Sequence, residues 1–218
     1  LQDRTRPGGI MDNAAGKRFT NESACYMAVG EILARDKNPD LDKVWIIWGK
    51  YYVKHYIRGN TSFLQPAKPW MNKSSSLAEL ADKTGLPLAK LEHTIDRWNR
   101  MAEQGRDEDF SRGELPYDRF MGDQFRHGHP NIEKLEPPFQ AVRVHPGCLG
   151  TNMGPVIDEN GCTQLKDGTL VEGLYAAGNA SASIFGNKYP GAGGTLGPAA
   201  VFGYRSGSHA AELLKSSQ

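Results

Sequence analysis

The sequence of 218 residues contains few cysteines and no long apolar segment. Its three cysteines, Cys25, Cys148 and Cys162, are far apart and form no C-x-x-C pair, which excludes a disulfide framework and favours a reducing cytoplasm as the location. No run of roughly eighteen apolar residues is present, so the sequence predicts no transmembrane segment. The first residues also lack the charged region and apolar stretch that are typical of a secretory signal.

An excess of one charge sign is also absent. Lys and Arg number 26 against 25 Asp and Glu, which gives a formal net charge of +1. A protein that binds nucleic acid through bulk charge needs a basic excess, so that class of protein is excluded. The hydrophobic fraction of 39% excludes wholesale disorder, and the length suffices for one large domain or two smaller ones.

Glycine is abundant, with 25 residues, but it is nearly absent from the middle of the sequence. There, Ser76 and Glu79 form a capping box, in which a hydroxyl and a carboxylate bind free amides at a helix start, and Gly85 is typical of a helix end. Pro87 opens a second helix, whose apolar residues keep a 3.6-residue period up to Gly105. We interpret both helices as packing elements.

The other elements are predicted from apolar runs and turn signals. We expect a helix over about 24–34, strands over 43–48 and 139–144, a loop over 105–129, an antiparallel ribbon over 156–170, a buried strand over 173–178 and a final helix from Thr195, with Pro198 in its first turn. Aromatic residues are frequent between positions 45 and 56. They either line a flat apolar pocket or pack in the core.

A glycine-rich turn that leads into the final helix is the most informative segment. Such a turn directs backbone amides and a partial positive charge at an anionic part of a ligand. The dinucleotide-binding fingerprint G-x-G-x-x-G does not match, because Gly191 and Gly193 are followed by Leu196 where the third glycine belongs. The sequence also ends about twenty residues later, so we expect no acid for a ribose hydroxyl.

Longer motifs make this segment specific. Y-P-G-A-G-G-T-L-G-P-A at 189–199, preceded by G-L-Y-A-A-G-N at 173–179, resembles the C-terminal signature of FAD-dependent 3-ketosteroid 1-dehydrogenases, within the wider fumarate reductase-like flavoprotein superfamily. The resemblance continues in G-K-R-F-T-N-E-S at 16–23, D-E-D-F-S-R-G at 107–113 and P-G-C-L-G-T at 146–151, and so covers nearly the whole chain in order. Family members also have an N-terminal half with G-x-G-x-x-G and a ribose-binding acid, and neither occurs here.

The resemblance implies an α+β fold in two parts. Residues 1–140 would be the substrate-binding (cap) domain, which also contributes to catalysis. Residues 141–218 would be the C-terminal strand–helix part of an FAD-binding α/β domain whose N-terminal half is absent. Because the sequence begins at Leu1, we expect a piece of a longer protein; a processed product, or a subunit that needs a partner chain with the nucleotide-binding half, are the alternatives.

The implied chemistry is removal of hydrogen next to a ketone. It needs a base for the proton beside the carbonyl, donors for the developing enolate oxygen, and a flavin that receives hydride. Tyr189, a phenol before a glycine turn, and the backbone N–H of Gly193 are expected to bind the keto oxygen, because glycine lets a bulky ligand approach the backbone. The resemblance gives Tyr26 the role of base; a free phenol has a pKa of about 10 and needs a partner that tunes it. Cys25 stands where proline is common in relatives.

FAD is the expected cofactor. Backbone amides at the start of the final helix are expected to stabilise negative charge on the reduced flavin ring. A second set of residues is expected near its ribityl or pyrophosphate portion. The first set comprises Gly194, Thr195, Leu196 and Gly197, with Pro198, which has no N–H, in the same first turn of the helix. The second set comprises Gly178 and Asn179.

No metal site is predicted. His127 and His129 are loop histidines without further ligands, and the segment Asp107–Asp109 is not followed by the oxygen ligands of a calcium loop.

The sequence therefore predicts flavin-dependent dehydrogenation of a 3-ketosteroid at C1–C2, with a steroid or another hydrophobic ketone as substrate. Fumarate reductase-like activity, or oxidation of another enone, is the alternative within the superfamily. Tyr189 stands in place of an arginine, which favours a neutral carbonyl over a dicarboxylate. An alternative of another class is an inactive fragment, or a subunit that needs a nucleotide-binding partner.

Overall fold

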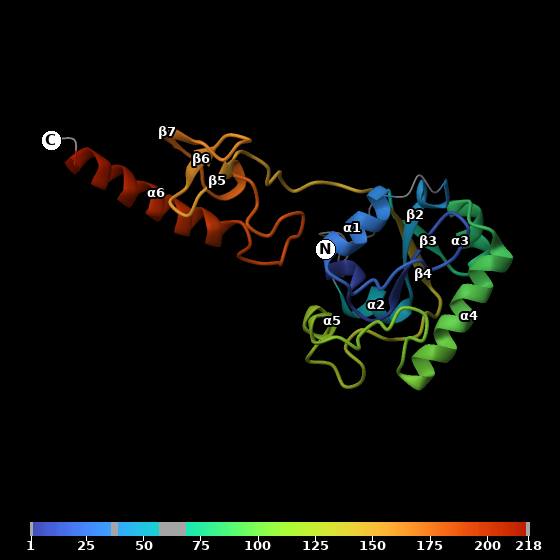
Figure 1. The fold of residues 1–218 in the computed structure, drawn as a ribbon. Coiled ribbons are helices and arrows are strands. Elements are labelled where there is room, and N and C mark those ends of the chain that lie inside the picture. The colour runs from blue at the N-terminus through green and yellow to red at the C-terminus, as the bar shows by residue number, and fades with distance from the viewer. Residues whose placement is uncertain (1, 36–38, 57–68, 217–218) are drawn as a thin grey trace. The chain divides into compact units, whose positions relative to one another are not determined.

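The computed structural model describes residues 2–35, 39–56 and 69–216. They form two compact units, Leu1–Pro146 and Gly147–Gln218, and each is considered by itself (Figure 1). The boundary at residue 140 that the sequence suggests lies inside strand β4 (Phe139–Val144). Residues 141–146 remain in the first unit because β4 is paired along its length in the sheet of that unit. Helices and sheets are both present, as the α+β class requires.

A four-stranded antiparallel sheet forms the centre of the first unit. Its order is β1-β2-β4-β3, with β1 at Gly9–Asp12, β2 at Val44–Trp48 and β3 at Asn72–Ser74. Every residue of β2 is buried, which explains its continuous apolar sequence, since a strand that is covered on both faces has no polar side. The predicted strands at 43–48 and 139–144 are confirmed.

Helices cover both faces of this sheet. One face packs on α3 (Leu77–Thr84) and α4 (Leu88–Gln104). The other face packs on α1 (Tyr26–Arg35) and α2 (Lys50–His55), as Figure 1 shows. The aromatic residues between 45 and 56 belong mostly to these two cores. Trp48 and Tyr52 are buried with ring centroids 5.1 Å apart, and the Tyr52 hydroxyl donates to Asp3 Oδ1 at 2.8 Å.

The local signals for α3 and α4 are confirmed. The Ser76 hydroxyl accepts a hydrogen bond from the Glu79 amide at 3.2 Å, and the Glu79 carboxylate accepts one from the Ser75 amide at 2.7 Å. Gly85 and Gly105 end the helices in the left-handed conformation, with φ of +72° and +70°. The prediction of an unbroken loop over 105–129 is wrong, because α5 (Pro116–Met121) forms there with proline in its first turn.

The second unit consists of a ribbon and one long helix. Strands β5 (Val156–Ile157), β6 (Cys162–Gln164) and β7 (Leu170–Tyr175) pair antiparallel in that order, and α6 spans Leu196–Ser216. The predicted ribbon and final helix are therefore confirmed. The prediction of a buried strand at 173–178 is wrong: β7 ends at Tyr175, is not buried among the described residues, and is followed by the short 3-10 helix η3 (Gly178–Ala180).

Candidate flavin and ketone site

The turn before α6 brings Tyr189 and the glycines together. The Gly194 amide donates to the Gly191 carbonyl at 3.0 Å and closes the turn. Gly191 and Gly193 have φ of +126° and +87°, where side chains are strained. The half-buried Tyr189 ring lies against the turn, since a Cβ at Gly194 would be 3.1 Å from its Cε2 atom. The sequence Y-P-G-A-G-G therefore fixes one phenol beside a backbone that only glycines can form.

Gly193 offers a ligand both space and a donor. A Cβ at this position would have no heavy atom within 4 Å. Its carbonyl accepts a hydrogen bond from the Gly197 amide at 2.8 Å, whereas its own amide has no acceptor among the described residues. A ligand carbonyl can therefore approach the Gly193 N–H without displacing an existing bond.

The amides at the start of α6 are not equivalent. Those of Gly194 and Gly197 donate within the turn, to Gly191 and Gly193. Those of Thr195 and Leu196 have no acceptor within the described parts of the chain, and they are the open donors that a helix start leaves. Of the four predicted amide donors, only Thr195 and Leu196 thus remain available for an anion.

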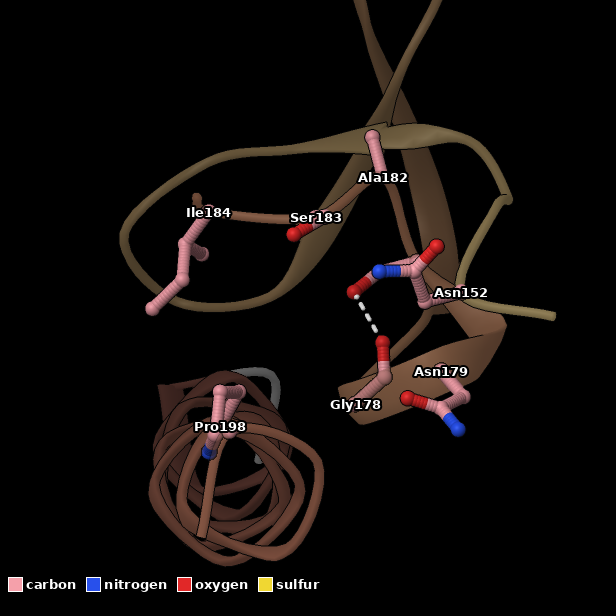
Figure 2. Close-up of a pocket in the computed structure, with 9 residues that line it drawn as sticks. Asn152, Gly178, Asn179, Ala182, Ser183, Ile184 and Pro198 are labelled. Atoms are coloured by element: carbon pink, nitrogen blue, oxygen red, sulfur yellow. Dashed lines mark hydrogen bonds between the residues drawn. The ribbon is translucent and has the colours of Figure 1, made fainter. Parts of the chain in front are cut away.

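A hollow within the second unit lies next to this turn (Figure 2). Its walls come from η3, from the segment after η3, and from the start of α6. Gly178 has a φ of +59°, and a Cβ there would lie 2.6 Å from the Cβ of Ala199, so glycine is required for η3 to pack on α6. The lining residues are Asn152, Gly178, Asn179, Ser181, Ala182, Ser183, Ile184, Gly194 and Pro198.

Four residues predicted to bind the cofactor, Gly178, Asn179, Gly194 and Pro198, thus line one hollow. The sequence did not single out Asn152 or the segment 181–184. These add amide and hydroxyl groups beside Asn179, which suit a polar ligand chain.

Tyr26 belongs to the first unit, whereas the other predicted site residues all belong to the second. It is the first residue of α1 and is half-buried. Cys25, where relatives often have proline, accepts a hydrogen bond from the Val29 amide at 3.2 Å through its backbone carbonyl, a bond that proline can also accept.

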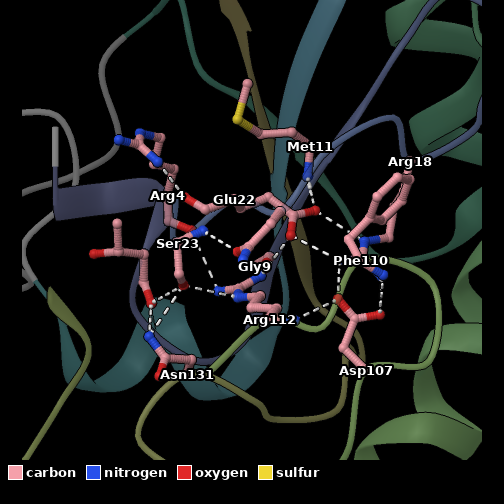
Figure 3. A network of polar contacts seen from close by, with 12 residues as sticks. Arg4, Gly9, Met11, Arg18, Glu22, Ser23, Asp107, Phe110, Arg112 and Asn131 are labelled. Carbon is pink, nitrogen blue, oxygen red and sulfur yellow. Dashed lines mark hydrogen bonds and ion pairs between the residues drawn. The ribbon is translucent and has the colours of Figure 1, made fainter. Parts of the chain in front are cut away.

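A buried ionic network supports the turn before Tyr26 (Figure 3). Arg18 donates to Glu22 at 2.8 Å and to Asp107 at 2.8 Å, and the Glu22 carboxylate also accepts from Arg112 at 3.2 Å. Burial opposes the ionisation of Glu22, but Arg18 and Arg112 outweigh it and hold its pKa below the ordinary value. Asp107, at the start of the segment that resembles a calcium loop, accepts hydrogen bonds from Arg18. The network lies in the motifs at 16–23 and 107–113.

Asp12 is a second buried acid, and neither of its carboxylate oxygens has a hydrogen-bond partner among the described residues. Burial, and then the nearby Glu22 charge, raise its pKa to about 7, whereas Arg18 opposes this rise. In the folded protein the carboxyl therefore stays protonated up to nearly neutral pH.

We expect Asp12→Asn to remove part of the pH dependence of stability. Between about pH 4 and 7 the unfolded chain has released a proton that the folded protein retains, so the free energy of unfolding falls as pH rises. The slope is up to about 1.4 kcal/mol per pH unit and vanishes above the folded pKa. Urea unfolding between about pH 5 and 7 measures it. Asp82→Asn, on the exposed side of α3, is the matched control. Equal slopes in wild type and Asp12→Asn would contradict the shifted pKa.

Comparison with known families matches residues 1–196 to a model described as an FAD binding domain. This chain belongs to that family. A 3-oxosteroid 1-dehydrogenase of Mycobacterium tuberculosis is 40% identical over 97% of the chain and 40% of the relative. A 4-oxocyclohex-2-ene-1-carboxylate 5-dehydrogenase of Sinomonas cyclohexanicum is 34% identical over 96% of the chain and 37% of the relative.

Among solved structures, a 3-ketosteroid delta1-dehydrogenase from Sterolibacterium denitrificans, in complex with 1,4-androstadiene-3,17-dione, superposes with a TM-score of 0.89 at 32% identity. The match covers 95% of this chain and 39% of that one. This chain thus spans about two fifths of the length of these relatives. No helix in its described residues is both long and apolar enough to cross a membrane.

The residues at the start of α6 and around the hollow fit a flavin nucleotide. The open Thr195 and Leu196 amides suit negative charge, and the polar hollow beside them suits a hydroxylated chain. No group of three or more His, Cys, Asp or Glu side chains within the described ranges is arranged to hold a metal ion.

Proposed function

We propose that this chain is the C-terminal catalytic part of an FAD-dependent dehydrogenase that introduces a double bond at C1–C2 of a 3-ketosteroid. The observation that carries the proposal is the turn at 189–194, where a phenol lies beside an unoccupied backbone donor with open space in front of it. Similarity to 3-oxosteroid 1-dehydrogenases over almost the whole chain supports the substrate class.

The first unit would serve as the substrate (cap) domain, and the second unit as the part of the FAD-binding domain that follows it in sequence. This division is supported by the position of Tyr26 in the first unit and of the hollow in the second. The nucleotide-binding half would come from the same protein or from a partner chain. A reducing cytoplasm remains the predicted location, on the basis of the cysteine content alone.

Two donors would stabilise the substrate oxygen during the reaction. The Tyr189 hydroxyl and the Gly193 amide would bind the C3 keto oxygen, where negative charge develops as the neighbouring proton leaves. Tyr26 would remove the proton from C2 as general base. Tyr189 and Gly193 are held by the same short turn, so their spacing is fixed before substrate binds.

Thr195 and Leu196, through their amides, and the residues of the hollow would hold FAD. When bound, FAD supplies the acceptor for the hydrogen that leaves C1 as hydride. Gly194 and Gly197 would act indirectly, because their amides keep the turn and the helix start in place.

A smaller cyclic ketone is the second candidate substrate. The relative from Sinomonas cyclohexanicum is named for a 4-oxocyclohexene carboxylate, which has the same ketone on a single ring. The proposed donors to the oxygen would serve both substrates equally, so the turn alone does not distinguish them.

Activity measurements on the complete flavoprotein separate these candidates. A 3-ketosteroid and 4-oxocyclohexanecarboxylate are each supplied with an artificial electron acceptor, and fumarate is supplied with a reduced dye. We expect kcat/KM to be highest for the steroid. Activity only with fumarate would contradict the proposal, and preference for the single-ring ketone would replace the substrate while keeping the chemistry.

We expect the 218-residue chain alone to bind FAD weakly. It offers the donors at the start of α6, but its sequence contains neither the G-x-G-x-x-G motif nor the ribose-binding acid. Gel filtration of the chain after incubation with FAD, with absorbance recorded near 450 nm (about the flavin maximum), measures retention. A stoichiometric yellow species would contradict the need for a nucleotide-binding half.

A further inference from the structure

Arg4 contacts the turn that leads directly into Tyr26. Its Nη1 atom donates to the Ala24 carbonyl at 2.7 Å and also to the carbonyl of Glu22. These carbonyls lie two and four positions before Tyr26, the first residue of α1. One guanidinium group thus binds two carbonyls of the same turn. Figure 3 shows Arg4 beside the backbone of Glu22, whereas Arg18 lies beside the Glu22 carboxylate.

The position of Arg4 is itself fixed by a buried residue. Arg112, which is fully buried, donates to the carbonyls of Arg4 at 3.2 Å, Arg6 at 2.8 Å and Gly9 at 2.7 Å. Its Nε atom also donates to the Ser23 hydroxyl at 3.2 Å. The backbone of residues 4–9 and the turn at 22–24 are therefore attached to the same guanidinium group, and Arg4 spans the short distance that remains between them.

We propose that Arg4 is a positioning residue for Tyr26. By binding the carbonyls of Glu22 and Ala24, it fixes the direction in which α1 leaves the turn and therefore the direction of the Tyr26 side chain. A general base must lie within hydrogen-bond reach of the proton it removes, and displacements of about 1 Å can cost 10²-fold in rate. This inference rests on the proposed role of Tyr26 as base.

The chain provides a matched control on the same segment. Arg6 is also half-buried, and its guanidinium carbon lies 5.0 Å from the centroid of the Tyr56 ring. Within the described residues it makes this cation–π contact and no hydrogen bond to the turn before α1. Loss of the Arg6 side chain removes equal charge and length from this segment and leaves the carbonyls of Glu22 and Ala24 bound.

Steady-state kinetics of the complete flavoprotein test the proposal with Arg4→Met, Arg4→Lys, Arg6→Met, Tyr26→Phe and the double variant Arg4→Met/Tyr26→Phe. We expect Arg4→Met to lower kcat about tenfold with KM changed less than about twofold. Arg4→Lys, which retains one donor, should recover part of the loss, and Arg6→Met should match wild type. The double variant should be no slower than Tyr26→Phe, because Arg4 acts only through Tyr26.

Wild-type kcat in Arg4→Met would overturn the proposal. So would a double variant about tenfold slower than Tyr26→Phe, since additive losses indicate a structural effect that is independent of Tyr26.

Amide hydrogen exchange of the peptide at 22–30 distinguishes failure of the positioning role of Arg4 from failure of the proposed function. We expect faster exchange in Arg4→Met than in Arg6→Met, whatever reaction the protein catalyses. Exchange as slow as in wild type would overturn the positioning role. Full steroid activity in Tyr26→Phe, with faster exchange in Arg4→Met, would instead remove Tyr26 from the proposed mechanism.

Discussion

Tyr189→Phe in the complete flavoprotein should lower kcat about 10²-fold or more, which is the effect of losing one donor to a developing oxyanion. The ring would remain against the glycine turn, because the ring atom beside Gly194 is Cε2, a carbon atom that phenylalanine also has. Only the hydroxyl would be lost. Because the proposed mechanism has that hydroxyl bind the oxygen most strongly when charge develops, kcat and kcat/KM should fall together.

Steady-state kinetics with a 3-ketosteroid provide the measurement. Tyr204→Phe removes a hydroxyl from an exposed side chain of α6 and serves as the control, with near-wild-type kcat expected. An unchanged kcat in Tyr189→Phe would remove Tyr189 from the mechanism. A rise in KM with kcat unchanged would assign the hydroxyl to ground-state binding instead.

Arg112→Met should reduce the free energy of unfolding by about 3–5 kcal/mol, the range for removing one partner from a buried ion pair. Both Arg112 and Glu22 are fully buried. Among the described residues, the substitution leaves Arg18 as the one cation that is ion-paired with the Glu22 carboxylate. It also removes a hydrogen-bond donor from the carbonyls of Arg4, Arg6 and Gly9. Methionine fills much of the volume, so the loss reflects unpaired polar groups rather than a cavity.

Urea unfolding of the complete flavoprotein measures the loss of unfolding free energy in Arg112→Met. Arg106→Met is the control variant. Arg106 makes a 3.1 Å ion pair with Glu114, but its side chain is 70% exposed, so its removal should cost at most about 1 kcal/mol. Adding Glu22→Gln to Arg112→Met should recover part of the stability, because the uncompensated charge is then gone. Equal effects of Arg112→Met and Arg106→Met would show that the buried network contributes little.

The helices and strands that are determined by residues close in sequence could be predicted from the sequence. Ser76 and Glu79 cap α3 within four residues, and Gly85 ends it, so this helix needs no distant partner to be recognised. The apolar run at 43–48 is equally local. The apolar residues at 173–178 suggest a buried strand, whereas β7 ends at Tyr175 and leaves most of its residues exposed in the second unit.

The candidate site was predictable where glycine geometry determines it. The motif at 189–199 indicated both the turn and the start of α6, and four of the predicted residues line the same hollow. Which amides remain open could not be read from the sequence, because Gly194 and Gly197 use theirs in bonds that only the folded turn forms. The network of Arg18, Glu22, Asp107 and Arg112 joins residues up to 90 positions apart, and no local pattern indicates that pairing.

The most direct test of the central claim is a crystal structure of the complete flavoprotein with a 3-ketosteroid bound. We predict that the Tyr189 hydroxyl and the Gly193 amide both lie about 2.7–3.1 Å from the steroid C3 oxygen. A C3 oxygen that is bound by other groups, with the Tyr189 hydroxyl directed elsewhere, would contradict the claim that Tyr189 and Gly193 bind the keto oxygen.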